Sequence, residues 1–278
     1  MEMAFCGFVC PKCGAGLKKE GKAFRCCAGH SYDIARSGYV NLLLNQQKKE
    51  KRHGDDRLMV RARQQFLGKG YYDPLMQRLK ELVLRHASDG MTLLDAGCGE
   101  CSYTAAILDG LYKTGISCRM LGVDISKDAV DIGAKRSQQM TLAVASVFDL
   151  PIAADSVDGI VSVFAPMAAE EFLRVLKPGG FVFKVVPRPR HLWSLKEQIY
   201  DSLYENNMEE TVPEGFVCET KENLEGEITL SSHEDIMNLF MMTPYFYKTS
   251  AKDQEKLAAL SKLVTEISFE ITVYQKKP

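Results

Sequence analysis

Long apolar runs are missing from this chain of 278 residues. The best stretch, residues 181–186, is short and contains Lys184, whereas a membrane-spanning helix needs about 18–20 consecutive apolar residues. The N-terminus also lacks the basic segment followed by an apolar segment that is typical of a secretory signal. We therefore expect a cytoplasmic protein with no membrane partner.

A strong overall charge is missing too, because 35 Lys and Arg residues offset 36 Asp and Glu residues to a net charge of −1. The balance hides an asymmetry. Residues 1–70 carry 14 basic and 6 acidic side chains, and residues 71–278 carry 21 and 30. A basic N-terminal part suggests an anionic partner, although an uneven solvated surface explains the charge alone equally well.

Five of the nine cysteines lie within the first 27 residues. Without an export signal, such cysteines indicate free thiols or a metal site and not a disulfide scaffold. The pattern C-x2-C-x12-C-x3-H, with paired ligands at the spacing of a tetrahedral zinc site, is formed by Cys10, Cys13, Cys26 and His30. Cys27 could replace Cys26 as the third ligand. Four protein ligands leave no position for water, so we expect a structural zinc ion.

The middle of the chain alternates buried apolar runs with segments of helical character. Strands are expected from residue 91 into a glycine turn, and at residues 119–126, 141–147, 158–163 and 181–186. Helices are expected at residues 102–111, 127–138 and 168–176. This order predicts a parallel sheet with helices on both faces. Further strands are expected at residues 227–230 and 269–274.

A glycine turn follows the first of these strands, with the sequence DAGCG at residues 95–99. Such a turn allows close approach of a ligand, and the acid that ends the next strand, Asp124, can bind a ribose diol. A dinucleotide-binding loop would have a third glycine where Ser102 stands, and Glu100 places a negative charge where a pyrophosphate would lie. The loop therefore favours a cofactor with a positive group and no phosphate, such as S-adenosylmethionine.

Several motifs carry a resemblance to a known family. LDAGCG (94–99), GVD (122–124), DLP (149–151) and LKPGG (176–180) together resemble the class I methyltransferases. With the Cys/His pattern, GYVNLL (38–43), AP (165–166) and PRHL (189–192), the chain resembles the RlmA family of 23S rRNA guanine-N1 methyltransferases. The resemblance implies an α/β fold, a Rossmann-like doubly wound sheet with a small N-terminal zinc-binding module. It also favours Cys26 over Cys27.

The resemblance extends to the cofactor site. It implies that S-adenosylmethionine is bound by Tyr72, Asp95, Gly97, Gly99, Glu100, Cys101, Asp124, Ser146 and His191. Ser146 departs from the class I pattern, in which many enzymes have an aspartate that accepts the adenine amino group. Its hydroxyl could still accept that hydrogen bond. The sequence identifies no catalytic base, since no spacing selects Asp33 or Glu170.

These observations divide the chain into three parts. We expect a zinc-binding RNA-recognition module at residues 1–36, a basic linker helix at 37–70 and a methyltransferase domain at 71–278. Residues 48–69 contain eight basic and three acidic side chains, which suggests contacts with phosphates.

The expected reaction is methyl transfer from S-adenosylmethionine to guanine N1 in a hairpin of 23S rRNA, and the resemblance also implies a homodimer. One alternative is a methyltransferase that acts on a small molecule or a protein. The other is a non-enzymatic zinc-ribbon RNA-binding protein, which the intact glycine turn and Asp124 disfavour.

Overall fold

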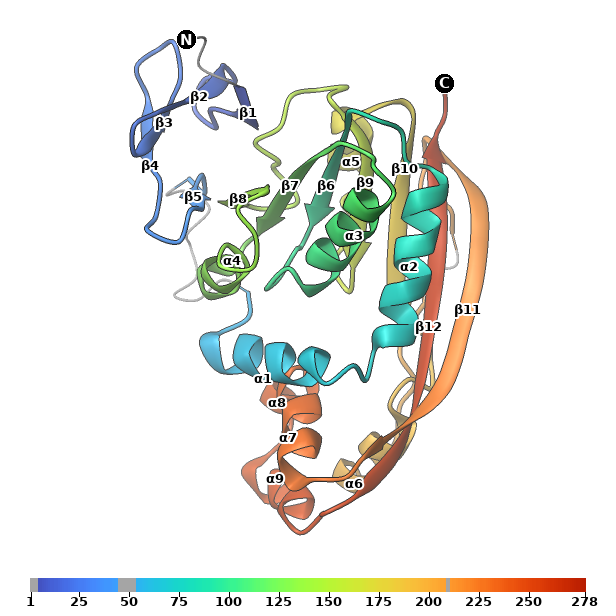
Figure 1. The fold of residues 1–278 in the computed structure, drawn as a ribbon. Coiled ribbons are helices and arrows are strands. Elements are labelled where there is room, and N and C mark those ends of the chain that lie inside the picture. Colours follow the sequence, from blue (N-terminus) through green and yellow to red (C-terminus); the bar gives the residue numbers. More distant parts are fainter. Residues whose placement is uncertain (1–4, 45–53, 209–210) are drawn as a thin grey trace.

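The computed structural model describes residues 5–44, 54–208 and 211–278. The N-terminal sheet is antiparallel, with strand order β1-β2-β3-β4 (Figure 1). Its strands are β1 (Phe5–Val9), β2 (Gly16–Glu20), β3 (Ala23–Arg25) and β4 (Ser31–Asp33).

The main sheet has eight strands in the order β11-β12-β10-β9-β6-β7-β8-β5. They are β5 (Val40–Asn41), β6 (Met91–Ala96), β7 (Cys118–Asp124), β8 (Met140–Val144), β9 (Val157–Val163), β10 (Leu176–Pro187), β11 (Phe216–Leu230) and β12 (Leu263–Lys276). From β10 to β5 neighbouring strands are parallel, whereas β12 runs antiparallel to both β10 and β11. The five strands expected between residues 91 and 186 are all present. The order of the sheet reverses between β6 and β9, which is where such folds bind ligands.

The helices of the described chain are α1 (Arg57–Gly68), α2 (Asp73–Arg85), α3 (Ser102–Lys113), α4 (Lys127–Gly133), α5 (Ala169–Val175), α6 (Trp193–Ile199), α7 (His233–Met241), α8 (Tyr245–Lys248) and α9 (Ala251–Ala258). Helix α4 begins after Ser126, whose hydroxyl accepts a hydrogen bond from the Ala129 N–H. It ends five residues earlier than the sequence suggested. None of these helices is long and apolar enough to cross a bilayer.

Two apolar clusters lie on the two faces of the main sheet. Consecutive strand residues point to opposite faces, so Leu93 belongs to the cluster under α2 and α3 while Leu94 belongs to the other. The second cluster also contains Phe172 of α5 and two side chains of the N-terminal sheet, Phe8 and Leu17. The N-terminal sheet therefore covers part of one face of the main sheet.

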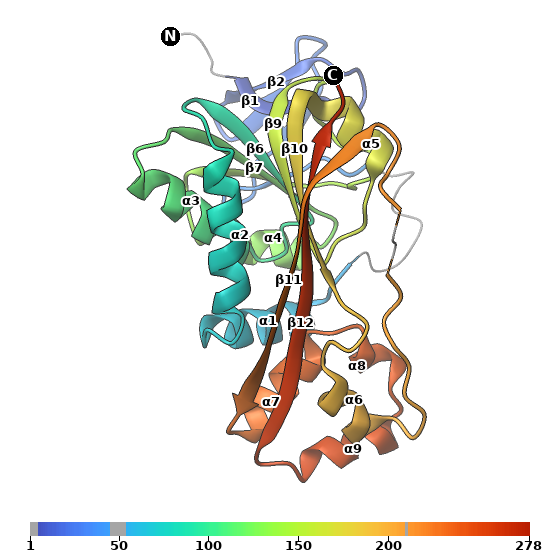
Figure 2. The ribbon, with the colours of Figure 1, turned by 90° about the vertical axis from the view of Figure 1, so that its right-hand side faces the viewer.

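Helix α1 lies across the carboxyl ends of the parallel strands, with α7, α8 and α9 beyond it (Figures 1 and 2). The segment before α1 reaches the end of β7, where the Ser126 hydroxyl donates to the Asp55 carbonyl at 2.5 Å. Within residues 37–70, where we expected one helix, Val40–Asn41 pair with β8 and the helix spans only Arg57–Gly68. Residues 45–53, with half of the basic side chains of residues 48–69, lie outside the described part.

The carboxy-terminal strands are much longer than the short segments expected at residues 227–230 and 269–274. β11 has 15 residues and β12 has 14. β11 is the edge strand of the sheet, and most of its side chains are polar and exposed. Its sequence therefore lacks the alternation of apolar and polar residues that predicts a strand.

Candidate functional site

Four potential metal ligands come together in the N-terminal sheet. One ligand atom from each of Cys10, Cys13, Cys26 and His30 lies within 4.8 Å of all the others. Cys10 and Cys13 flank the turn after β1, and Cys26 and His30 flank the turn after β3. Cys27 is exposed and is not in the group.

The spacing of these atoms fits zinc. Tetrahedral zinc with Zn–S bonds of about 2.3 Å and a Zn–N bond of about 2.0 Å separates two sulfur atoms by about 3.8 Å and sulfur from nitrogen by about 3.5 Å. The Cys13 and Cys26 sulfur atoms are 3.7 Å apart, and His30 Nδ1 is 3.4 Å from the sulfur atoms of Cys10 and Cys26. The Tyr32 hydroxyl lies 3.1 Å from Cys10 Sγ, where it can orient that ligand.

The glycine turn after β6 is built for close approach. Gly97 has a φ of +88°, and its N–H donates to the Val123 carbonyl at 2.8 Å. A Cβ atom added to Gly97 would lie 2.5 Å from the Cβ of Ala165. Only glycine therefore allows the turn to pack against the segment that follows β9.

Asp124 closes the same turn from the end of β7. Its two carboxylate oxygens accept hydrogen bonds from the backbone N–H groups of Gly99, at 2.9 Å, and Ser126, at 2.7 Å. A carboxylate offers about four acceptor positions, so lone pairs remain for a ligand. Burial raises the pKa of Asp124, against the two backbone hydrogen bonds.

Asp95 is buried at the end of β6 and accepts a hydrogen bond from the Thr104 hydroxyl. Burial raises its pKa to about 7, and the negative charges of Asp124 and Glu100 act in the same direction. The geometry therefore makes Asp95 an internal support of the loop.

Glu100 and Cys101 complete the turn and lead into α3. Glu100 is buried and forms an ion pair with Arg136, which also donates to the Glu100 carbonyl at 2.6 Å. Cys101 has a φ of +65° and is fully buried. Its sulfur lies close to Gly133, where an added Cβ would be 2.6 Å away, so Cys101 packs the loop against α4.

Tyr72 and His191 lie together although 119 residues separate them. The Tyr72 hydroxyl is 3.3 Å from His191 Nε2, and both side chains are buried. Phe269 contacts both rings, at centroid distances of 5.0 and 4.6 Å.

Ser146 lies after β8, and its hydroxyl accepts a hydrogen bond from the Phe148 N–H at 3.2 Å.

Two residues beside the turn were not expected from the sequence. Arg63 of α1 reaches to within 3.6 Å of a Cβ built on Gly99 and forms an ion pair with Asp55 at 2.5 Å. Tyr103 has a buried hydroxyl without a hydrogen-bond partner in the described part of the chain. Buried polar groups usually have a partner, so a ligand that accepts a hydrogen bond from the Tyr103 hydroxyl would complete the site. Neither residue belongs to a motif, and only the fold brings them to the turn.

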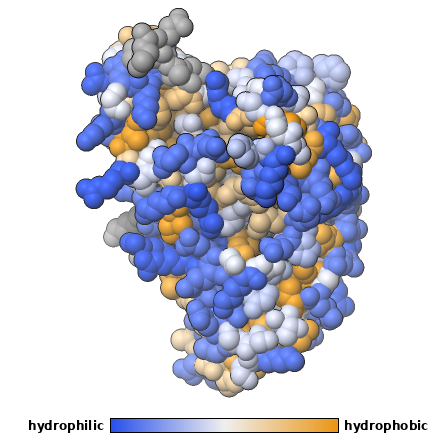
Figure 3. All heavy atoms as spheres, viewed as in Figure 1, coloured by the Kyte–Doolittle hydropathy of each residue, from blue (hydrophilic) through white to orange (hydrophobic). Residues whose placement is uncertain are grey.

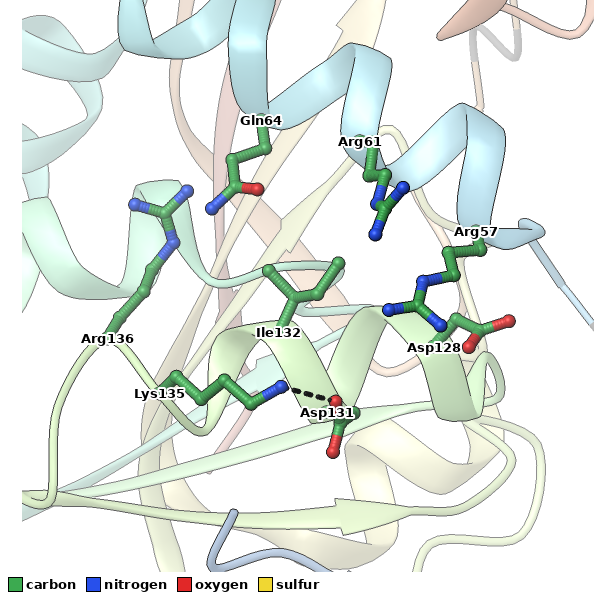
Figure 4. Close-up of a pocket in the computed structure, with 8 residues that line it drawn as sticks. All are labelled: Arg57, Arg61, Gln64, Asp128, Asp131, Ile132, Lys135 and Arg136. Carbon is green, nitrogen blue, oxygen red and sulfur yellow. Dashed lines mark hydrogen bonds and ion pairs between the residues drawn. The ribbon is translucent and has the colours of Figure 1, made fainter.

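A basic cavity of about 330 Å³ lies between α1 and α4, next to this turn (Figure 4). Its lining residues are Arg57, Arg61, Gln64, Asp128, Asp131, Ile132, Lys135 and Arg136. Lys135 pairs with Asp131 at 2.7 Å, and Arg136 pairs with Glu100. Among the residues that the structure describes, the side chains of Arg57 and Arg61 have no hydrogen-bond or ion-pair partner.

Comparison with known proteins gives two family models and several relatives. The model described as "RlmA, N-terminal", a zinc ribbon, matches residues 8–51, and a methyltransferase-domain model matches residues 93–180. A protein of Micromonospora griseorubida, provisionally named a 23S rRNA (guanine-N1)-methyltransferase, is 32% identical over 92% of both chains.

Two more relatives carry similar names. The 23S rRNA (guanine(748)-N1)-methyltransferase of Streptomyces fradiae is 35% identical, over 68% of this chain and 66% of its own. YxjB of Bacillus subtilis, also provisionally named a 23S rRNA (guanine-N1)-methyltransferase, is 34% identical over 70% of each chain.

Proposed function

Since the chain belongs to the RlmA family of 23S rRNA (guanine-N1)-methyltransferases, we propose that it methylates N1 of a guanine in a hairpin of 23S rRNA, with S-adenosylmethionine as the methyl donor. The observation that carries this function is the presence of two family-specific parts in the same chain. An RlmA zinc ribbon and a methyltransferase domain occur together, and a relative with this activity in its name matches 92% of the chain.

The cofactor would lie at the carboxyl ends of β6 and β7, where S-adenosylmethionine supplies a methyl group on a positively charged sulfur. Gly97 and Gly99 provide a turn without side chains, and Asp124 has acceptor positions for the ribose hydroxyls. Glu100 and Asp95 hold the turn from inside through Arg136 and Thr104, and both keep the cofactor role that the family resemblance implies. Tyr72, Cys101, Ser146 and His191 keep the cofactor roles that the family resemblance implies.

Guanine N1 lies on the Watson–Crick edge and bears a proton. The base must therefore be unpaired or flipped out of a helix, and its proton must leave as the N1–carbon bond forms and the sulfur–carbon bond breaks. The remaining contribution of the protein is placement of the nitrogen in line with the methyl group. We assign no residue to the removal of the proton.

RNA binding would use two basic surfaces, one on the N-terminal sheet and one in the cavity between α1 and α4. Lys18, Lys19 and Lys22 are exposed on the N-terminal sheet, and Arg57 and Arg61 line the cavity between α1 and α4. Hydrophilic side chains dominate this side of the molecule (Figure 3). Phosphate contacts of this kind fix the register of an RNA without reading its sequence.

Zinc would be held by Cys10, Cys13, Cys26 and His30 as a structural ion. The division into residues 1–36, 37–70 and 71–278 stays a proposal, as do a cytoplasmic location and a homodimer. Only the homodimer follows from the family resemblance, and sedimentation velocity would test it by a species of twice the monomer mass.

The test is a map of N1-methylguanine in 23S rRNA. The methyl group blocks base pairing, so reverse transcription stops at the modified base. A strain without this gene should lose one stop, and the intact gene should restore it while the Asp124→Asn version should not. A matched control is Tyr112→Ala, which removes an exposed ring from α3 far along the helix. Identical stops with and without the gene would overturn the proposal.

A further inference from the structure

We propose that Phe164 is the platform on which the target guanine stacks during methyl transfer. This inference rests on the proposed function and adds the position of the acceptor base. Phe164 directly follows β9, and 44% of its surface is exposed. It therefore presents an open aromatic surface at the carboxyl edge of the main sheet.

The backbone of Phe164 is strained. Its φ is +54°, a left-handed conformation that a bulky side chain rarely adopts. Glycine would occupy this conformation without cost, so a phenylalanine here implies that the ring itself is needed. Such outliers cluster at ligand sites. β9 and β6 are the neighbouring strands between which the sheet order reverses, which is the usual ligand position.

Contacts on both sides hold this strained segment in place. The Phe164 N–H donates to the Val185 carbonyl at 3.0 Å. The next residue, Ala165, accepts a hydrogen bond at its carbonyl from the buried Lys184 ammonium group and packs against Gly97. The ring therefore belongs to a fixed loop that touches the glycine turn at residues 95–99, named the cofactor turn because the cofactor is proposed to bind there.

The neighbours of Phe164 connect it to the rest of the proposed site. Its ring lies 6.4 Å from that of Tyr103, nearly perpendicular to it, and 5.6 Å from that of Phe269. Phe269 in turn contacts Tyr72 and His191. Phe164 is thus the exposed end of an aromatic row that begins at the residues assigned to the cofactor.

A flipped base needs such a surface. Outside the helix a guanine loses its stacking neighbours, and an aromatic side chain replaces them. Stacking fixes the plane of the base but not its rotation within that plane. Phe164 would therefore hold the guanine beside the cofactor turn, and hydrogen-bonding groups would select the N1 edge.

The experiment compares five proteins on unmodified 23S rRNA transcripts: wild type, Phe164→Ala, Phe164→Gly, Phe164→Tyr and the control Tyr112→Ala. Phe164→Ala should lower kcat/KM for RNA by about tenfold or more, as expected when one base–aromatic stack is removed. Phe164→Tyr should stay within about threefold of wild type because it keeps the ring. Affinity for S-adenosylmethionine should be unchanged in every variant, as in the control Tyr112→Ala.

Phe164→Gly distinguishes the effect of losing the ring from the effect of backbone strain. Glycine tolerates positive φ, so this variant should unfold at no lower temperature than Phe164→Ala, yet it should be as inactive. Wild-type kcat/KM in Phe164→Ala or Phe164→Gly would leave the proposed function unaffected but would refute the stacking role of Phe164. A loss in Phe164→Tyr equal to that in Phe164→Ala would also overturn it. If wild type methylates no guanine N1 in 23S rRNA, the proposed function itself fails.

Discussion

The Tyr72 hydroxyl lies 3.3 Å from Nε2 of His191, and both side chains are buried. The other ring nitrogen, Nδ1, accepts a hydrogen bond from the backbone N–H of Ser268 at 3.1 Å. A neutral imidazole that accepts at Nδ1 carries its proton on Nε2 and donates it to Tyr72. The Tyr72 hydroxyl then keeps its own proton for another acceptor, which the proposed cofactor would provide.

The first prediction concerns the pH dependence of stability. Burial lowers the pKa of His191 to about 3, and the charge of Lys196 acts in the same direction. Between this value and the ordinary value of 6.5, the unfolded chain binds a proton at this residue and the folded chain does not. Acidification therefore favours unfolding, and the contribution of His191 is fully present only above about pH 6.5.

His191→Asn isolates this contribution, because the difference between wild type and variant cancels other titrating groups such as Asp95. The difference in unfolding free energy should increase by about 1.4 kcal/mol per pH unit between about pH 4.5 and 5.5, level off around pH 6.5 and be constant above about pH 7.5. Urea titrations at several pH values measure it. A difference that does not change with pH would show that His191 titrates normally in the folded protein.

The second prediction concerns Asp124. Asp124→Ala should weaken S-adenosylmethionine binding by at least about tenfold, or 1.4 kcal/mol, because the ribose hydroxyls lose a charged acceptor. Titration calorimetry measures this change. The control is Asp109→Ala, which removes an exposed acid of α3 that pairs only with Lys113 in the described chain. Equal affinities of wild type and Asp124→Ala would refute the ribose assignment.

The sequence was informative where function depends on short spacing. The Cys and His ligands follow a pattern of turns, so a four-ligand site could be predicted from the spacing, whereas the choice of Cys26 over Cys27 came from the family resemblance. The position of Asp124 could also be predicted from the sequence, because an acid at the end of a buried parallel strand must lie at the carboxyl edge of the sheet. The five central strands were found for the same reason, since each is a compact apolar run.

Features that depend on contacts between distant parts of the chain could not be predicted from the sequence. Phe164 follows a strand like many loop residues, and only the structure shows its positive φ and exposed ring. Arg63 reaches the turn because α1 folds across the sheet. The family resemblance suggested Tyr72 and His191 separately, but their direct contact depends on the register of β12, which supplies Phe269 and Ser268.

The third prediction decides the register of the zinc ligands. Cys26→Ser should lose zinc, because Cys26 Sγ lies 3.7 Å from Cys13 Sγ and 3.4 Å from His30 Nδ1. Cys27→Ser should retain one zinc per chain, because Cys27 is exposed and outside the group. Elemental analysis of both purified proteins measures zinc content. Loss of zinc in Cys27→Ser, with retention in Cys26→Ser, would reverse the assignment.

The fourth prediction concerns the cavity between α1 and α4. If Arg57 and Arg61 contact RNA phosphates, replacing both with Gln should weaken RNA binding and lower the slope of log K against log salt by about one for each phosphate that is no longer neutralised. Affinity for S-adenosylmethionine should not change. Lys113→Gln removes an exposed charge from the end of α3 and is the control. An unchanged salt slope would exclude the cavity from the RNA interface.

The fifth prediction concerns the N-terminal sheet, whose two faces have different neighbours. On the inner side, Phe8 and Leu17 are fully buried against the main sheet, and the Val9 N–H donates to the Pro151 carbonyl at 2.8 Å. By contrast, Lys18, Lys19 and Lys22 of the same sheet are exposed. Deleting residues 1–36 would therefore uncover apolar surface of the main sheet and remove basic charge at the same time.

Replacing Lys18, Lys19 and Lys22 with Gln changes only exposed positions of this sheet. Zinc content, thermal midpoint and S-adenosylmethionine affinity should stay at wild-type values, because these side chains are exposed and lie away from the core and the turn. KM for 23S rRNA transcripts should rise, and the salt slope of binding should fall by about one for each phosphate that these lysines neutralise in the wild type. If both stay at wild-type values, the N-terminal sheet covers the main sheet without contributing to recognition, and its basic charge is only a solvated surface.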